Sequence, residues 1–333
     1  LWLKHRAFAC LRPCRGAFPA LPRRWPRMAA AGGEAAGNGS AAGTKEVVLV
    51  TGCSTGLGRG LCLELSKRPG TLVVATARRL SAIADLRESG AAALALEVDV
   101  ASEASLKSAM EQAAALGGGA LGAVICNAGI SCFGPAAVQP LEEVQKVLDT
   151  NVLGVLRTVQ AAVPFMAKPS GKGGRVLIVG SISATLTTPF AGAYCASKAA
   201  VQALGEALRM ELKPLGISVT NIHAGAIRSN FSSCAEGNSD LDRYKEGPYA
   251  SLLPAIKTRI WLSQTQPTTQ SPEKVAQDIL RKCFGQGPSP AAILVAGGAF
   301  KALVYGFVQK WLPAWLMDFA MAKTFGLAQL GAP

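Results

Sequence analysis

Histidine is scarce in this chain of 333 residues, which contains only His5 and His223. A metal centre built from several histidines is therefore excluded, and a Ser-His-Asp hydrolase would have to use His223. His223 lies at the end of a predicted strand, where we expect no ligand role. The sequence thus predicts no metal site and excludes a metal-dependent hydrolase.

Paired cysteines are also lacking. The nine cysteines are scattered along the chain, form no C-x-x-C pair and are odd in number. This pattern indicates reduced, mostly buried thiols in a reducing compartment. The chain also has no internal repeat of roughly 20–50 residues, which excludes solenoids and propellers.

Acidic residues are absent from residues 1–27, which contribute +7 of the formal net charge of +13. The remaining chain has no basic stripe with interleaved aromatics, so we expect no nucleic-acid partner. Residues 28–44 are rich in Ala, Gly and Ser, and residues 1–44 are predicted to form a disordered leader. The Arg-rich front fits a transit peptide to a chloroplast or another organelle. The alternatives are a sequence that is incomplete at its front and a translation start at Met28.

Short apolar runs alternate with helical patterns along residues 45–297. Strands are predicted over residues 46–51, 72–77, 93–98, 121–126, 175–180, 217–222 and 291–295. Helices are predicted after residue 58 up to 67, over residues 102–115, 141–166 and 192–212, and from residue 272. Residues 231–272 have little regular pattern. In an open α/β sheet such a segment covers the ligand crevice, so we expect it to form a lid.

A glycine-rich loop separates the first strand from its helix, and it reads Gly52-Cys53-Ser54-Thr55-Gly56-Leu57-Gly58. Strand, glycine loop and helix form the dinucleotide-binding arrangement. The glycines permit a tight turn and a close approach to the pyrophosphate, which binds the N–H groups of the helix N-terminus.

The end of the second strand indicates which dinucleotide binds. NAD enzymes place a carboxylate there for the ribose 2′-hydroxyl, but this chain has Arg78 and Arg79. Guanidinium groups can pair with a 2′-phosphate, and Arg59 is expected to assist them. The sequence therefore favours NADP(H) over NAD(H). The alternative is that both arginines are ordinary surface residues.

A phenol and an ammonium lie four residues apart in Tyr194-Cys195-Ala196-Ser197-Lys198, on one face of a predicted helix. A nearby positive charge lowers the pKa of a tyrosine, which then can exchange a proton with an oxygen. Ser181, after the fifth strand, can donate a hydrogen bond to a carbonyl oxygen. Asn151 is unfavourable inside a helix, which suggests a function or a satisfied buried amide.

These motifs, with Asn127-Ala128-Gly129, together resemble the short-chain dehydrogenase/reductase family over residues 46–296. The resemblance implies a Rossmann-type, doubly wound parallel sheet of about seven strands in three α/β/α layers. It implies that Tyr194 is the general acid, that Lys198 lowers its pKa and holds the nicotinamide ribose, and that Ser181 polarises the substrate carbonyl. Asn151 would support a water between Lys198 and solvent. The cofactor contacts would be Gly52, Ser54, Thr55, Gly56, Leu57, Gly58, Arg78, Arg79, Asp99, Val100, Asn127, Ala128, Gly129, Tyr194, Lys198, Ala226, Ile227 and Ser229.

Two branches of the family are similar to the chain. The residues around Cys53, Cys126 and Cys195 resemble 17β-hydroxysteroid and retinol dehydrogenases. Residues 76–80, 224–231 and 312–327 are similar to NADPH-dependent 1-acyldihydroxyacetone-phosphate reductases. The second branch implies reduction of a lipid-like ketone at the endoplasmic reticulum or lipid droplets, and we favour it. The alternatives are a retinal, steroid or other lipophilic carbonyl reductase, and a non-catalytic dinucleotide-binding protein of lipid droplets.

The tail, residues 298–333, is apolar and aromatic but is interrupted by Lys301, Lys310 and Lys323. No run is long and clean enough to span a bilayer. Trp, Phe and Lys together fit a segment that lies on a membrane or lipid-droplet surface. The alternatives are a helix packed on the core and a dimer contact, and the family resemblance also suggests a homodimer through the long helices.

Overall fold

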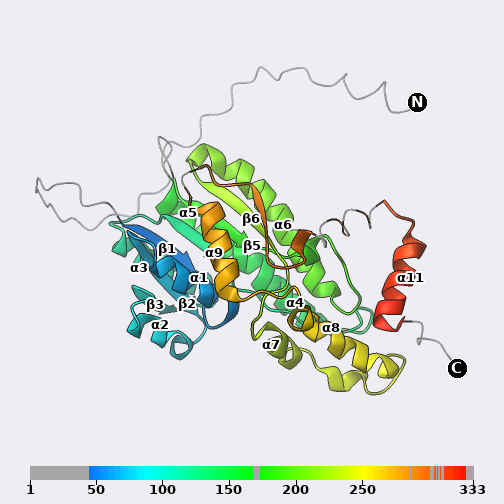
Figure 1. The fold of residues 1–333 in the computed structure, drawn as a ribbon. Helices are drawn as coiled ribbons and strands as arrows, with labels where there is room; N and C mark the ends of the chain where they lie inside the picture. Colours follow the sequence, from blue (N-terminus) through cyan, green and yellow to red (C-terminus); the bar gives the residue numbers. More distant parts are fainter. Residues whose placement is uncertain are drawn as a thin grey trace, which may run out of the picture. The chain divides into compact units, whose positions relative to one another are not determined.

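The computed structural model describes residues 45–167, 173–285, 287–300, 304, 306, 308 and 311–327. In this part of the chain, parallel strands form one sheet in the order β3-β2-β1-β4-β5-β6-β7 (Figure 1). The strands are β1 (Glu46–Val50), β2 (Thr71–Ala77), β3 (Leu94–Glu97), β4 (Ala123–Cys126), β5 (Arg175–Val179), β6 (Ser218–Ala224) and β7 (Ala292–Val295). The predicted seven-stranded, doubly wound sheet is confirmed.

Helices cover both faces of the sheet. The helices of the described residues are α1 (Gly56–Ser66), α2 (Ala84–Glu88), α3 (Glu103–Leu116), α4 (Leu141–Leu148), α5 (Gly154–Met166), α6 (Gly192–Leu212), α7 (Phe231–Gly237), α8 (Leu253–Thr265), α9 (Pro272–Cys283) and α11 (Ala314–Phe325). The neighbours α1 and α9 pack together on one face (Figure 1), and α3 packs against α5. Ser102 begins α3 as predicted, because its hydroxyl accepts a hydrogen bond from the N–H of Ser105.

The core lies in two layers, one on each face of the sheet. Val48 and Val50 of β1 pack in the layer that includes α1 and α9, whereas Val47 and Leu49 pack in the layer of α3, α5 and α6. Successive side chains of a strand point to opposite faces, and all four are buried, so both faces are covered.

The helix predicted over residues 141–166 is interrupted. A π-helical turn, Asp149–Leu153, separates α4 from α5. Asn151 lies in this turn. Its side-chain oxygen accepts a hydrogen bond of 2.8 Å from the N–H of Ile130, and its side-chain N–H donates one of 2.9 Å to the carbonyl oxygen of Ile130. Residues 141–166 are therefore helical throughout, as predicted, but they contain a wider turn that the sequence pattern did not indicate. Such turns are rare and often mark functional sites.

The segment without a sequence pattern, residues 231–272, contains α7 and α8. Their apolar residues form a third cluster with Phe133, Phe190 and, from the tail, Phe325, which we call the lid cluster. The rings of Phe190 and Phe325 are 6.3 Å apart in an edge-to-face arrangement. In the described part of the chain no helix has the length and apolar character needed to cross a bilayer. The predicted leader, residues 1–44, lies outside the described residues, as does the end of the tail, residues 328–333.

Candidate active site

A cavity of about 740 Å³ opens where the carboxyl ends of the central strands meet. In doubly wound sheets, ligands bind at this edge, where the strand order reverses. Most residues that the sequence pointed to line it: Gly52, Ser54, Thr55, Gly56, Leu57, Arg78, Asp99, Val100, Asn127, Ala128, Gly129, Ser181, Tyr194, Lys198, Ala226, Ile227 and Ser229. The fold thus brings residues that are far apart in the sequence to one wall.

Two positions of the glycine loop, Gly52 and Gly56, require glycine for two reasons. Gly52 and Gly56 have φ angles of +73° and +58°, which side chains rarely adopt. A Cβ on Gly52 would lie 2.8 Å from the Cα of Ala128, and a Cβ on Gly56 would lie 2.8 Å from the Cβ of Ser229. The loops after β1, β4 and β6 therefore approach one another closely. Any side chain at these two positions would separate them.

The N-terminus of α1 faces the loop without a competing anion. No acidic residue lies in its first turn, and its N-cap residue, Thr55, makes no side-chain cap hydrogen bond. The first N–H groups of a helix lack intrahelical partners and favour an anion. This end of α1 therefore suits a phosphate group.

Asn127 fixes the loop to the sheet. Its side-chain amide donates to the carbonyl oxygens of Thr51 and Gly52, at 2.9 and 3.0 Å. In return, the hydroxyl of Thr51 accepts hydrogen bonds from the N–H groups of Asn127 and Ala128, both at 3.0 Å. These reciprocal bonds hold the ends of β1 and β4 together beside the cavity.

The two arginines after β2 differ in position. Both are exposed, but Arg78 lines the cavity and Arg79 does not. Gly58 and Asn151 also lie outside the cavity wall. Gly58 serves packing, because a Cβ there would lie 2.3 Å from the carbonyl oxygen of Gly52.

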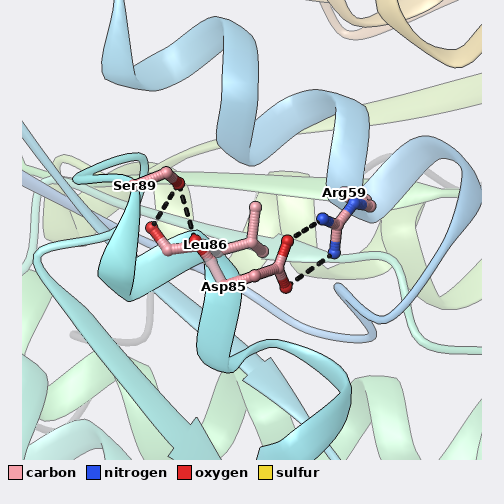
Figure 2. A network of polar contacts seen from close by, with 4 residues as sticks. All are labelled: Arg59, Asp85, Leu86 and Ser89. Atoms are coloured by element: carbon pink, nitrogen blue, oxygen red, sulfur yellow. Dashed lines mark hydrogen bonds and ion pairs between the residues drawn. The ribbon is translucent and has the colours of Figure 1, made fainter.

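Arg59 forms an ion pair with Asp85 of α2. Figure 2 shows its guanidinium forming two hydrogen bonds with the carboxylate of Asp85, one of them 3.2 Å long. The pair raises the pKa of Arg59 and lowers that of Asp85. The hydroxyl of Ser89 bonds to the carbonyl oxygens of Asp85 and Leu86 one turn away. The structure therefore shows Arg59 joining α1 to α2, and its assistance to Arg78 stays a prediction.

The buried side chain of Asn151 connects two parts of the site. Besides its bonds to Ile130, its amide donates to the hydroxyl of Ser197 at 3.0 Å. Ser197 lies on α6 beside Lys198, and its hydroxyl donates to the carbonyl of Tyr194 at 2.7 Å. The π-helical turn thereby holds the strip of α6 that carries the phenol and the ammonium.

Ser181, Tyr194 and Lys198 converge on the cavity from the end of β5 and the first turns of α6. Ser181 is held in place because its hydroxyl accepts a hydrogen bond of 3.1 Å from the N–H of Ser183. The Nζ atom of Lys198 lies 5.8 Å from the centre of the Tyr194 ring, as expected for residues one turn apart. Phe231, the first residue of α7, packs on that ring with centroids 5.6 Å apart.

The pKa of Tyr194 differs from the prediction. Burial raises it to about 12, although Ser181 and the charge of Arg259 act to lower it. Burial lowers the pKa of Lys198 to about 8. Desolvation therefore dominates both groups, because it disfavours the charged form of each. The predicted lowering of the tyrosine pKa by Lys198 was wrong for this structure, in which the phenol stays protonated at neutral pH.

Three cavity residues carry no distinguishing signal in the sequence, namely Phe133, Phe231 and Arg259 of α8. From the sequence alone, Lys245, Lys257 and Arg259 are equal candidates for a lid cation that meets a substrate phosphate. The structure buries Arg259 in the cavity wall, whereas both lysines are exposed. No local pattern distinguishes the three cations, since only the tertiary packing of the lid determines which side chain is buried.

A parallel sheet of this order, with a glycine loop and a cavity at its carboxyl edge, defines a doubly wound dinucleotide-binding protein. Comparison with known families identifies it further. The family profile of short chain dehydrogenases matches residues 46–238. The chain belongs to this family of oxidoreductases, whose members bind NAD(H) or NADP(H) and interconvert alcohols and carbonyls.

Similar proteins include steroid and lipid enzymes. The chain is 36% identical to rat estradiol 17-beta-dehydrogenase 1 over 74% of its length and 72% of that protein. The match to human 17-beta-hydroxysteroid dehydrogenase type 1 is 36% identical over 60% of this chain and spans 62% of that protein, less than two thirds. The NADPH-dependent 1-acyldihydroxyacetone phosphate reductase of Schizosaccharomyces pombe is 35% identical over 63% of this chain and 70% of that protein.

Solved structures agree with the fold. A short-chain dehydrogenase from Streptomyces avermitilis superposes with a TM-score of 0.68 at 26% identity, over 85% of this chain and 98% of the other. The two proteins therefore share the fold over most of both chains.

Proposed function

We propose that this protein is an NADPH-dependent reductase that converts a lipid-like ketone to an alcohol. The observation that carries the proposal is the convergence of Ser181, Tyr194 and Lys198 on one cavity that the glycine loop also lines. A hydride carrier and a proton donor are the two components that reduction of a carbonyl requires.

The cavity residues fit a nicotinamide dinucleotide. Gly52 and Gly56 leave free the space that a Cβ would fill, and the N-terminus of α1 offers N–H groups to a pyrophosphate. NADP(H) is supported by Arg78, which lines the cavity directly after β2, and by the lack of a carboxylate at that place in the sequence. The cofactor supplies the hydride.

The protein's own groups control the proton. Tyr194 donates its phenolic proton to the carbonyl oxygen as negative charge develops there, and the Ser181 hydroxyl donates a hydrogen bond to the same oxygen. The phenol is protonated at neutral pH, which is the form that a proton donor requires. Asn151 and Ser197 fix the orientation of α6, so that the phenol is positioned before the substrate binds.

For the substrate we propose 1-acyldihydroxyacetone phosphate, which would give a lysophosphatidic acid. The similarity to the fission-yeast reductase supports this choice. Apolar residues of the cavity, among them Phe133, Phe231 and Leu262, suit an acyl chain. A second candidate is a steroid or retinoid carbonyl, which the similarity to the 17-beta-hydroxysteroid dehydrogenases favours.

The test is NADPH oxidation by the purified full-length protein in detergent micelles. Three substrates are compared, namely 1-acyldihydroxyacetone phosphate, retinal and a steroid ketone, with NADH as the control cofactor. Turnover of the acyl phosphate with NADPH supports the proposal. Turnover of only retinal or the steroid moves the protein to the second candidate. NADPH binding without any turnover favours a non-catalytic protein of lipid droplets.

We further propose that α11 lies on a membrane or lipid-droplet surface, at the endoplasmic reticulum. Trp315 and Phe319 are 69% and 66% exposed on this helix, and Leu316 lies between them. On the same helix Phe325 is buried in the lid cluster. One end of α11 is therefore anchored to the protein while its aromatic side faces outward, as expected for an interfacial helix.

A further inference from the structure

Arg259 is a buried cation in the wall of the cavity that contains Tyr194. It lies in α8, and only 8% of the residue is exposed. Its Nε donates a hydrogen bond of 2.7 Å to the hydroxyl of Thr188. Its guanidinium carbon lies 5.1 Å from the centre of the Phe133 ring, within the range of a cation–π contact. These contacts fix the side chain, and since no described residue hydrogen-bonds to either terminal nitrogen, both are left for another partner.

No carboxylate in the described part of the chain neutralises the charge of Arg259. In the described part of the chain, Arg259 takes part in none of the ion pairs. The titratable groups that face it are the phenol of Tyr194 and the thiol of Cys195, and burial lowers the pKa of the guanidinium. Burial of a charge costs free energy unless the charge is paired, so an unpaired buried arginine indicates an anion that comes from outside.

The position of Arg259 indicates which anion this is. Thr188, which holds Nε, lies in the chain between Ser181 and Tyr194, and Phe133 follows β4. Among the described residues, the hydrogen bond to Thr188 and the ring contact with Phe133 both lie away from the glycine loop, where the pyrophosphate of a dinucleotide binds. The guanidinium therefore belongs to the substrate side of the cavity.

We propose that Arg259 binds an anionic group of the substrate, a phosphate or a carboxylate, and so selects acidic lipids over neutral ones. This inference rests on the proposed reductase function. A guanidinium presents two parallel N–H groups to such an oxyanion, which a lysine cannot do. The exposed lid cations are poorer candidates, because Lys245 pairs with Asp242 and Lys257 points to solvent.

The test compares kcat/KM for 1-acyldihydroxyacetone phosphate, for its dephosphorylated analogue and for a long-chain keto acid. We expect the wild type to prefer an acidic substrate over the neutral one, and the two acidic substrates distinguish phosphate from carboxylate. Arg259→Gln should reduce this preference at least about tenfold, and Arg259→Lys should restore part of it. Lys257→Gln, on the same helix, removes one exposed charge and should leave the preference unchanged.

The ratio of kcat/KM for acidic and neutral substrates distinguishes a loss of packing from a loss of anion binding. An equal decline with acidic and neutral substrates in Arg259→Gln would show that Arg259 only holds the lid, and would overturn the inference while the reductase function stands. A second measurement does not need turnover, namely binding of 1-acylglycerol 3-phosphate and 1-acylglycerol in the presence of NADP⁺. If the wild type reduces no carbonyl, the proposed function fails, but a phosphate-dependent affinity lost in Arg259→Gln still supports the anion site. Equal affinity for both lipids in the wild type would refute it.

Discussion

The Nζ atom of Lys198 donates a hydrogen bond of 2.9 Å to the carbonyl oxygen of Val179, at the end of β5. The lysine is 7% exposed, and burial lowers its pKa from an ordinary value of 10.5 to about 8. An ammonium group in such a place costs the folded protein about 3 kcal/mol at neutral pH. The protein retains an unfavourable charge beside its candidate general acid, as active sites often do.

Lys198→Met should therefore stabilise the cofactor-free protein and abolish turnover. Removal of the charge cost, less about 1 kcal/mol for the lost hydrogen bond, predicts a gain of about 2 kcal/mol at pH 7. Below pH 8 the lysine is protonated in both the folded and the unfolded state, so the gain is constant. Between pH 8 and 10.5 the folded lysine loses its proton first, and the gain shrinks. Urea unfolding at pH 7 and pH 10 measures both values, and a variant less stable than the wild type at pH 7 would contradict this account.

Tyr194→Phe should abolish reduction while NADPH still binds. The substitution removes the proton donor and leaves the ring, which keeps its contact with Phe231. General acid catalysis contributes roughly 10²–10⁴-fold to a rate, so kcat should fall at least about a hundredfold. Steady-state kinetics at saturating substrate gives kcat, and quenching of protein fluorescence by NADPH gives the dissociation constant. Retained turnover would show that another group donates the proton.

The sheet could be predicted from the sequence because its strands are short, buried apolar runs with glycine or polar residues at their ends. Each predicted strand end lies within two residues of the structure. The position of the cavity could also be predicted, because parallel strands bring their carboxyl ends to one edge of the sheet. Ser181 and Tyr194 needed no tertiary information beyond this topology.

Other features depend on tertiary contacts that no local pattern reveals. The π-helical turn forms because Asn151 bonds to Ile130, which lies 21 residues earlier in the chain. Arg59 was expected near the cofactor, but Asp85 of α2 pairs with it. The pKa of Tyr194 also depends on how deeply the lid buries the phenol, and its charged neighbours along the helix do not determine it.

Arg78 should determine the preference for NADPH over NADH. A guanidinium–phosphate contact is a charge-assisted hydrogen bond, so its loss in Arg78→Ala should raise the KM for NADPH roughly ten- to a hundredfold. The KM for NADH should change little, because NADH has no 2′-phosphate. Arg79→Ala is the matched control, since Arg79 is exposed outside the cavity wall. Equal effects of the two substitutions on both cofactors would mean that the arginines act only through the general positive field.

The outward side of α11 should bind lipid surfaces. Trp315 and Phe319 contribute most of its exposed aromatic area, so the double substitution Trp315→Glu and Phe319→Glu should remove most of the protein from liposomes of zwitterionic and anionic phospholipids in a flotation assay. A matched control is Leu116→Glu with Met210→Glu, which places two carboxylates at exposed apolar residues of α3 and α6. Because α11 is held to the lid cluster by Phe325, reduction of a water-soluble ketone should persist in the α11 variant. Flotation that is unchanged in the α11 variant, or lost equally in the control, would show that this helix does not carry the membrane contact.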